Sequence, residues 1–530
     1  MTKKTKEAAT ARGRPRRTTA GCPKGGFQDK QASHDRAAQA SKPRLRTANR
    51  QQLLSPKTID QLLETDHPAR AVWRYVEDLD LSLLYDRIGS REGFSGRPAI
   101  DPRVLVALWL YAYLAGISSA RLLARLCRRD DVFRWLAGGL VINYHTLADF
   151  RVDDVDFLEQ LFQHSVEVLR QQGLVDLERV AQDGIRIRAS AGAASFRRRQ
   201  TLERLLQEAK AKLAGLEQQL ADKGAAGSQE TARQPDERPR CPPQGRNGTS
   251  KATNTTTDSI AQQGFASEGT GPKQREGVGR EATAGQQQPT TSKAKRAARL
   301  RHARQRVARI EQALLRLPEL EARKAPGEEH KARVSTTDPE ATVMKMADGG
   351  YRPAYNLQLS TTCDNQVVVG VAVDTSGSDR GQLPPMLDQI EKRFGQRPQE
   401  ALVDGGYVDY EEITKVQQGK KGCKVYAPVP ASRKEGVDCY APKSKDSPQV
   451  AEWRQRMGTA EAKEIYKQRG ATAEWVNAQA RNHGLQQLLI RGKNKVIAIG
   501  LWLATALNMV RGFFLQFQPV GSSALSPSGP

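Results

Sequence analysis

Residues 224–290 form a long polar segment that interrupts the chain. The regions before and after it must therefore fold without its help. Gly, Gln, Thr, Ser and Pro dominate the segment, which has hardly an aliphatic side chain. It therefore cannot bury enough apolar surface to offset the entropy cost of ordering it. Amphipathic helical patterns lie on both sides of it, over 195–223 and 292–317. We predict a helical hairpin insertion over 195–335 whose tip, 224–290, is disordered.

Strand patterns stand before and after this insertion. Residues 178–193 alternate apolar and polar side chains with a period of two, which indicates a strand. Two further strands are expected over 354–362 and 366–375, and after a helix another strand ends at Asp404. A short strand over 423–430 follows. This order predicts a mixed α/β core that is interrupted by the hairpin insertion.

The part of the chain before the first strand has two different compositions. Residues 1–52 are predicted to form a disordered basic arm, because the first fifty residues hold 14 Lys or Arg and only three acids. Residues 53–177 carry helical periodicity, which predicts an all-α domain. One of its helices could lie against DNA as recognition helices do, although composition alone favours a plain helical bundle. The apolar runs 104–117 and 496–507 are too short to span a bilayer and are expected to be buried helices.

Net charge and cysteine usage narrow the functional class. The chain has 530 residues, a net charge of +24 and a pI near 9.9, which favours a polyanionic partner, either nucleic acid or an acidic membrane face. Its six cysteines are scattered without a C-x-x-C pair, which argues against a zinc ribbon or a disulfide framework. The basic N-terminus has no apolar segment behind it, unlike a secretory signal. We therefore expect a cytoplasmic protein.

Three acids are candidate site residues. Asp183 lies on the first predicted strand and Asp404 ends a later one, and each is followed by glycine. Glu474 lies on a predicted helix, with Asn477 and Arg481 at i+3 and i+7 on the same face. Each acid alone could be a turn, cap or surface residue. If the two strands are neighbours and the helix covers the sheet, the three carboxylates can meet at the strand ends.

Such a cluster predicts a metal site. Neighbouring carboxylates raise one another's pKa values, and divalent cations relieve this repulsion. Ligands that are all oxygen suit Mg²⁺ or Mn²⁺, and two such ions can promote phosphodiester cleavage. The glycines after the two aspartates would let metal and phosphate approach the backbone. Asp374 and Asp379, in "VDTSGSDRGQL", could supply a fourth acid, but a loop position favours capping.

Several segments together resemble a known family. They are "RPAIDPRVLVALWLYAYLAGISSARLLARLCRRDDVFRWLAGG", "YHTLADFR", "GGYRPAYNLQLSTT", "VVVGVAVDTSGSDRGQLPPML" and "ALVDGGYVDYEEI", together with the series Tyr466, Arg469, Glu474 and Arg481. They are similar to bacterial insertion-sequence DDE transposases, which have an RNase H-like catalytic core and, in one group, a third motif of Tyr, Arg, Glu and a basic residue. The resemblance covers about 55–200 and 335–515.

The resemblance implies a role for each matched residue. Asp183, Asp404 and Glu474 correspond to the catalytic, metal-binding triad, with two Mg²⁺ or Mn²⁺ ions as cofactor. Tyr466, Arg469 and Arg481 would contact DNA near it. Two details depart from the family pattern. Four residues rather than three separate Arg469 from Glu474, and Arg481 stands where lysine is usual; arginine keeps the charge but binds phosphate as a fork.

The same resemblance implies the fold and the function. The catalytic core would comprise 178–194 and 336–517, an RNase H-like mixed sheet flanked by helices, with a disordered tail at 518–530. The protein would bind the terminal inverted repeats of its own element in double-stranded DNA, cut them and join them to target DNA. It would act as a homodimer in the synaptic complex, in the bacterial cytoplasm at the nucleoid. The alternatives are a catalytically inactive or domesticated DNA-binding protein and, less strongly, a nuclease that cuts without joining.

Overall fold

The computed structural model describes residues 58–90, 98–229, 290–419, 422–432, 436 and 438–516. The predicted basic arm 1–52 and tail 518–530 lie outside the described residues, as do residues 230–289 of the predicted disordered loop. Contacts divide the chain into Met1–Thr58 and Ile59–Pro530. All elements described below belong to the second unit.

The N-terminal part of this unit is helical, as the periodicity predicts. Several of its helices begin at a side chain that accepts a hydrogen bond from the first-turn backbone, and Asp101 followed by Pro102 is one such start. The apolar helix that follows is almost entirely buried, and the Trp109 indole donates to the Leu147 carbonyl at 3.0 Å. The elements are η1 Asp60–Leu62, α2 Pro68–Glu77, α3 Ser82–Asp86, α4 Pro102–Leu114, α5 Ala120–Arg129, α6 Asp131–Leu136, α7 Tyr144–Asp153 and α8 Val155–Gln171.

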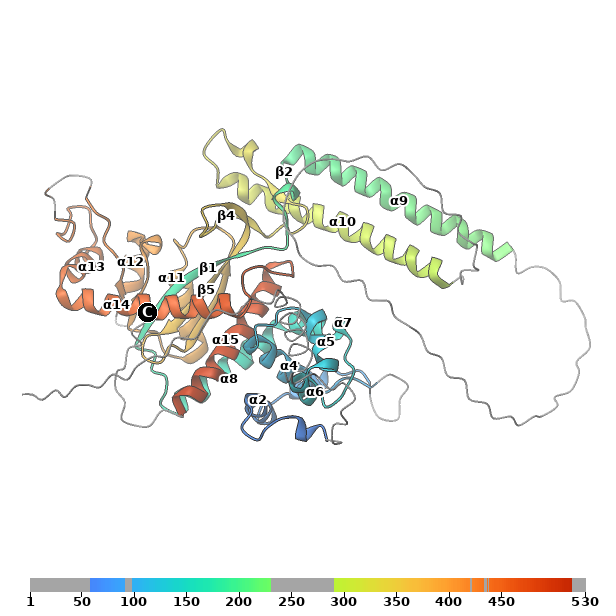
Figure 1. The fold of residues 1–530 in the computed structure, drawn as a ribbon. Coiled ribbons are helices and arrows are strands. Elements are labelled where there is room, and N and C mark those ends of the chain that lie inside the picture. Colours follow the sequence, from blue (N-terminus) through green and yellow to red (C-terminus); the bar gives the residue numbers. More distant parts are fainter. Residues whose placement is uncertain are drawn as a thin grey trace, which may run out of the picture. The chain divides into compact units, whose positions relative to one another are not determined.

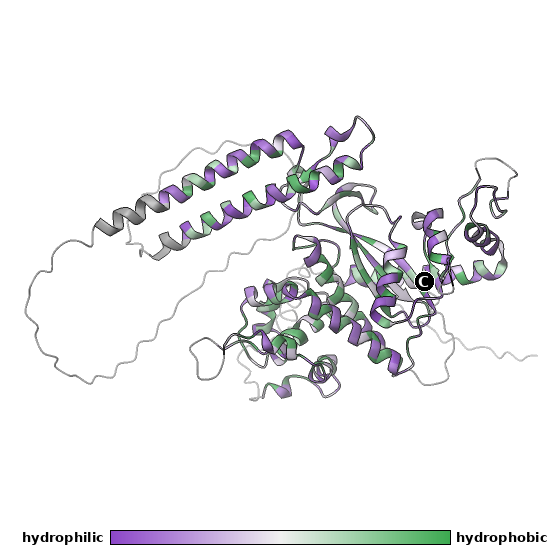
Figure 2. Cartoon of the chain, turned by 180° about the vertical axis from the view of Figure 1, so that it is seen from behind, coloured by the Kyte–Doolittle hydropathy of each residue, from purple (hydrophilic) through white to green (hydrophobic). Residues whose placement is uncertain are grey.

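The insertion forms a two-helix hairpin (Figure 1). Its helices α9 and α10 pack around their own hydrophobic cluster, which is distinct from the main core. Helix α9 continues to Gln229, past the helical pattern read over 195–223. Figure 2 shows that the hairpin is largely hydrophilic, while green residues concentrate in the sheet and the helices beside it. The elements are η2 Ala193–Ser195, β2 Phe196–Arg197, α9 Arg199–Gln229, α10 Thr290–Ala322, η3 Glu329–Lys331 and β3 Val334–Ser335, with β2 antiparallel to β3.

A six-stranded mixed sheet forms the centre of the molecule. Its order is β4-β5-β1-β7-β8, and β6 also pairs with β5. Strand β5 is antiparallel to β1, β4 and β6, whereas β1, β7 and β8 are parallel. The mixed α/β architecture predicted from the sequence is confirmed. The strands are β1 Arg179–Arg188, β4 Thr342–Lys345, β5 Tyr351–Thr362, β6 Val368–Asp374, β7 Glu400–Leu402 and β8 Lys424–Tyr426.

Helices from the C-terminal half cover the sheet. Helix α14 (Ala460–Asn482) contacts β1 and β5, and α15 (Lys493–Gln516) lies between the sheet and the N-terminal helices α4, α7 and α8. By length and composition α15 could cross a membrane, but 78% of its apolar window is buried inside the fold, as expected for a core helix. The remaining elements are α11 Leu383–Phe394, η4 Gly405–Tyr407, α12 Tyr410–Gln417 and α13 Pro448–Gly458.

Gly500 marks the closest approach of α15 to the sheet. A Cβ atom at this position would lie 2.8 Å from Leu357 Cδ1 and 3.0 Å from Val371 Cγ1, both on buried side chains. Because overpacking a core typically costs about 1–3 kcal/mol, we expect Gly500→Ala to lower the free energy of unfolding by that amount.

The same substitution at Gly470 of α14 is the matched control. A Cβ added there would meet no neighbouring atom of the described residues within 4 Å outside the helix's own backbone. Because alanine favours a helix more than glycine does, Gly470→Ala should raise the free energy of unfolding by about 0.5–1 kcal/mol. Chemical denaturation of both variants measures the difference. Equal changes in the free energy of unfolding for the two variants would show that α15 does not pack closely against the sheet at Gly500.

Candidate active site

The register of two parallel strands brings the first two predicted acids together. Strand β1 pairs with β7 only over Arg179–Ala181, with Ala181 opposite Leu402. Asp183 and Asp404 each lie two residues further on, so both follow the last paired positions. There β1 continues along β5 while the chain leaves β7 for the short helix η4. The Asp404 carboxylate caps that helix, accepting from Gly406 N at 2.8 Å.

Helix α14 supplies two side chains to this pair of carboxylates. The Arg469 guanidinium lies 3.1 Å from Asp183 Oδ2 and 3.8 Å from Asp404 Oδ2, so a single cation bridges both acids. The buried Asn477 carboxamide donates to Asp183 Oδ2 at 3.0 Å. Asp183 Oδ1 accepts from the N–H of Gly184 at 2.9 Å. The Asp183 side chain is 18% exposed, whereas that of Asp404 is 39% exposed.

The third predicted acid is placed differently. Glu474 is exposed and has no hydrogen bond or ion pair within the described part of the chain, although Asn477, one turn later, reaches Asp183. Among the described residues, no three His, Cys, Asp or Glu side chains are grouped closely enough to hold a metal ion. The structure thus brings Asp183 and Asp404 together and leaves Glu474 apart from them.

The predicted DNA-contacting residues occupy three different environments. Tyr466 is half-buried, and its hydroxyl donates to the Val403 carbonyl at 3.2 Å, which supports the strand end just before Asp404. Arg469 bridges the two aspartates. Arg481 is exposed and lines the cleft that contains both acids.

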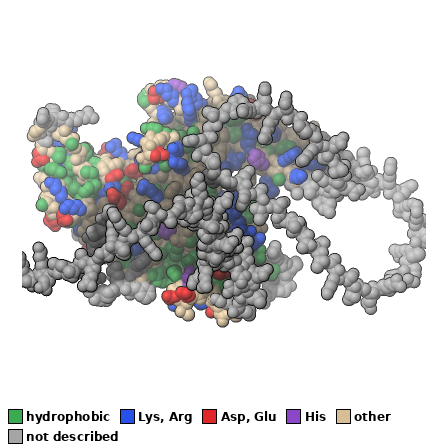
Figure 3. Space-filling model, viewed as in Figure 1, with side chains coloured by type: hydrophobic (Ala, Val, Ile, Leu, Met, Phe, Trp, Pro, Cys, Tyr) green, Lys and Arg blue, Asp and Glu red, His purple; other side chains and the backbone are tan. Residues whose placement is uncertain are grey.

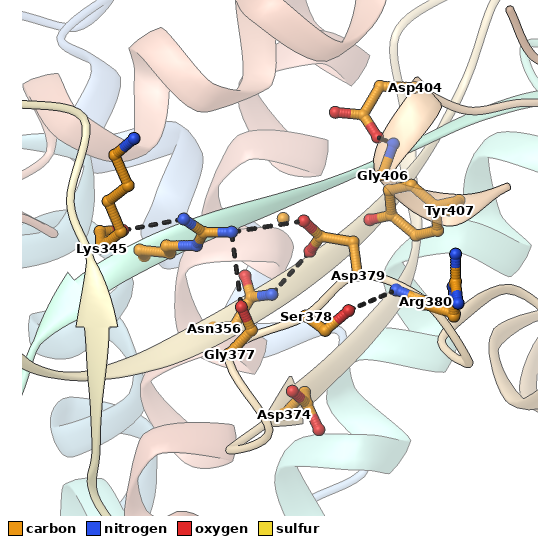
Figure 4. Close-up of polar contacts among 12 residues, drawn as sticks. Lys345, Asn356, Asp374, Gly377, Ser378, Asp379, Arg380, Asp404, Gly406 and Tyr407 are labelled. Atoms are coloured by element: carbon orange, nitrogen blue, oxygen red, sulfur yellow. Dashed lines mark hydrogen bonds and ion pairs between the residues drawn. The ribbon is translucent and has the colours of Figure 1, made fainter. Parts of the chain in front are cut away.

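Asp379, whose loop position favoured a capping role, lines the cleft that contains Asp183 and Asp404. Its Oδ1 accepts from Asn356 Nδ2 at 2.6 Å and from Gln358 Nε2 at 2.8 Å, and Arg186 lies 3.7 Å from Oδ2. Figure 4 shows this carboxylate between Asn356 and the turn that carries Asp404 and Tyr407. Asp374 does cap its loop, because its Oδ2 accepts from Ser376 N at 2.7 Å.

The glycine after Asp183 has a structural role that differs from the expected one. A Cβ at Gly184 would lie 2.5 Å from Asn356 Oδ1, 2.5 Å from Gln358 Nε2 and 2.6 Å from Asp379 Oδ1. Gly184 therefore makes room for the Asp379 carboxylate and its two amide donors. The sequence predicts that this space admits a metal ion and phosphate, whereas side chains of the chain itself fill it.

The acids open onto a cleft of about 650 Å³. Basic side chains from β1, β4 and the end of α14 surround its acidic centre, so the cleft combines carboxylates with a cationic rim. Its lining comprises Asp183, Gly184, Ile185, Arg186, Arg188, Lys345, Met346, Ala347, Asp348, Asp379, Asp404, Arg481, Leu485, Gln486 and Gln487.

Burial dominates the electrostatics of Asp183. It raises the pKa of this carboxyl above its ordinary value of 3.8, and the Asp404 and Asp379 carboxylates raise it further, while Arg469 and the Gly184 N–H lower it. Burial is also the main cause of the raised pKa of Tyr407, to which Asp379, Asp183 and Asp404 add. Asp183 is therefore held in a setting that disfavours its own negative charge, and a cation would relieve this.

Replacing Asp183 by asparagine should stabilise the fold at neutral pH. A carboxyl with a higher pKa in the folded than in the unfolded chain lowers stability as the pH rises from its ordinary value through its folded value. We expect Asp183→Asn to raise the free energy of unfolding by on the order of 1 kcal/mol at a pH above the folded-state pKa of Asp183, the usual size of a single-residue effect. Below pH 3.8, the ordinary pKa of this carboxyl, the substitution should leave that free energy unchanged. Denaturation midpoints across this range measure the difference. A variant less stable than the parent at neutral pH would mean that the ion pair with Arg469 outweighs burial.

The donor atoms around the two aspartates fit a hard divalent cation. Asp183 and Asp404 offer carboxylate oxygens, the ligands that Mg²⁺ and Mn²⁺ prefer. The Asn477 carboxamide presents its donor Nδ2 to Asp183, so the candidate ligand oxygens come from the two aspartates.

Comparison with known protein families gives a match in the N-terminal part of the chain. Residues 57–153 match a family model described as a transposase domain (DUF772). No curated protein and no solved structure matched. The match lies on the N-terminal helices, whereas the paired aspartates lie on the sheet. It supports a transposase, and with it a DNA-processing enzyme in general.

Proposed function

We propose that the protein is a DDE transposase with an RNase H-like catalytic core. The observation that carries this proposal is that adjacent parallel strands bring Asp183 of β1 together with Asp404, just beyond the end of β7, where a half-buried acid and a more exposed one share a cationic partner. The strand order β6-β5-β1-β7-β8, with the first three antiparallel and the last three parallel, supports the RNase H-like assignment. The transposase-domain match on the preceding helices is consistent with it.

The proposed cofactor is a pair of Mg²⁺ or Mn²⁺ ions. Asp183, Asp404 and Glu474 would hold them, with Glu474 joining the two aspartates from its exposed position on α14. When bound, such ions supply a nucleophile and stabilise charge on the attacking and leaving oxygens. Arg469 neutralises the two aspartates, and Asn477 fixes the orientation of the Asp183 carboxylate.

The proposed substrate is double-stranded DNA, namely the terminal inverted repeats of the element and its target. Arg481 lies on the rim of the cleft, where a guanidinium can bind a phosphate. Tyr466 and Arg469 would contact DNA from the neighbouring turns of α14. Two DNA ends must be brought together for strand transfer, so we propose a homodimer in the synaptic complex, acting in the bacterial cytoplasm at the nucleoid.

A cleavage and strand-transfer assay tests this function. The full chain is incubated with duplexes that carry the element's ends and with a target plasmid, with Mg²⁺, with Mn²⁺ or with a chelator. Metal-dependent nicking at the ends followed by joining is expected. Nicking without joining would indicate a nuclease, and binding without nicking would overturn the proposed enzyme.

A second candidate function follows from the placement of Glu474. An inactive or domesticated DNA-binding protein would keep the basic cleft without assembling a third acid, and Glu474 stands apart from the two aspartates. The same assay separates the two candidates, because this protein would bind the repeats without any metal-dependent nicking.

A further inference from the structure

The hairpin helix α10 carries an unbalanced positive charge. Residues 290–310 contain eight Lys or Arg and no acid. Some of this charge is neutralised from α9, since Arg304 lies 2.8 Å from Glu217. Arg299 and Arg306 have no ion pair with any described side chain and are exposed. Figure 3 shows Lys and Arg side chains on the visible part of the hairpin.

These unpaired arginines line a groove between the two hairpin helices. Arg299, His302 and Arg306 from α10 face Lys212 of α9 across it. Glu208 is the one acid in its lining, and that carboxylate lies 3.7 Å from Arg204. The charged side chains of this groove are therefore mostly cationic, and Ala and Leu side chains line the rest of it.

The cationic surface continues from the groove toward the cleft that holds the two aspartates. Burial lowers the pKa of Arg309, and the guanidinium groups of Arg491 and Arg306 lie near enough to lower it further. Arg309 Nε is buried and has no hydrogen-bond partner among the described residues. Arg491 in turn donates to the carbonyl of Ser190, just beyond the end of β1.

The last part of this surface reaches the cleft itself. The chain before Arg491 runs beside the end of β1, where Leu488 N donates to the Arg188 carbonyl at 2.8 Å. Gln486 and Gln487 of this segment line the cleft together with Arg188 and Arg481. Like-charged guanidinium groups repel one another, and an anion placed along them relieves this repulsion.

We propose that Arg299, Arg306, Arg309 and Arg491 form a basic track that binds the sugar-phosphate backbone of duplex DNA and guides it into the cleft. This inference rests on the proposed function in one respect, namely that the bound polyanion is DNA. The hairpin insertion is then a DNA-binding arm. Because the contacts are to phosphates, the track contributes affinity without sequence preference.

The test measures DNA binding rather than catalysis. The full-length variant Arg299→Gln, Arg306→Gln, Arg309→Gln is compared with a control that loses the same charge, Arg204→Gln, Arg304→Gln, Arg323→Gln. Each control arginine is paired with a glutamate, namely Glu208, Glu217 and Glu319. Fluorescence anisotropy records the affinity for an end-sequence duplex and for a random duplex over a salt series, and circular dichroism checks folding.

The expected result is a change in the salt dependence. Each phosphate contact contributes about 0.9 to the magnitude of the slope of log K against log salt concentration. The slope of the track variant should therefore be smaller in magnitude by about 2–3 than that of the parent, and by the same amount for both duplexes. The control should lose less than about 1, because its charges are already neutralised. Equal slopes for the two variants would overturn the track. Loss on the end sequence alone would overturn a phosphate-backbone role.

These readouts separate the track from the proposed enzyme. A protein that binds DNA through the track but never nicks it would refute the enzyme and leave the track standing. A protein that nicks DNA while both triple variants bind like the parent would refute the track alone.

Discussion

Asp404→Asn should abolish metal-dependent strand cleavage while leaving the fold and DNA binding intact. A bound cation contributes several kcal/mol of transition-state stabilisation. Each 1.36 kcal/mol corresponds to a tenfold change in rate, so we expect the single-turnover rate to fall by about 10³-fold. The fold should tolerate the change because asparagine also caps helix η4 and the Asp404 side chain is 39% exposed. Single-turnover cleavage of an end duplex measures the rate.

The control for this result is Asp374→Asn. Asp374 is the last residue of β6 and caps the turn that follows the strand, so its replacement should leave the cleavage rate near that of the parent. Unchanged cleavage by Asp404→Asn would remove this residue from the catalytic machinery, whatever the behaviour of the control. Loss of cleavage together with loss of DNA binding would point to misfolding instead of a missing ligand.

Glu474→Gln should reduce cleavage about as strongly as Asp404→Asn, whereas Asp379→Asn should reduce it less. If Glu474 is the third metal ligand, losing its charge removes direct stabilisation worth several kcal/mol. Asp379 is held by Asn356 and Gln358 beside Gly184, so we expect it to position the site, and residues behind a metal ligand typically change activity by about 10–100-fold. Cleavage rates of the two variants, measured over a series of Mn²⁺ concentrations, give the comparison.

The opposite ranking would reassign the third acid. Strong loss in Asp379→Asn with near-normal cleavage in Glu474→Gln would mean that Asp379, and not Glu474, is the third ligand. The Mn²⁺ series adds a second readout, because a metal ligand shifts the metal concentration needed for half-maximal rate. A residue with a purely structural role would leave this concentration unchanged.

The strands and their two acids could be predicted from the sequence because the signals are local. Alternating side chains identify β1, and the apolar run before Asp404 identifies the strand end. The prediction that Asp183 and Asp404 meet assumed that their strands are neighbours. The parallel pairing of β1 with β7 confirms this assumption. The same local signals located the hairpin helices on either side of the polar segment.

The parts of the site that the sequence did not predict depend on packing. Asp379 follows a strand in a polar loop, and only the fold shows that the empty space above Gly184 admits its carboxylate. On α14, spacing alone placed Glu474 and Asn477 on one face, yet only Asn477 is buried against Asp183. Residues three apart on a helix differ by about 60° in direction, which is enough to separate a buried side chain from an exposed one.

Mn²⁺ binding followed by electron paramagnetic resonance tests the central claim most directly. That claim is that Asp183 and Asp404 together hold a divalent cation. The parent protein and Asp374→Asn should bind Mn²⁺ with the same affinity, and Asp183→Asn and Asp404→Asn should each bind it much more weakly. Equal Mn²⁺ binding by all four proteins would contradict the account.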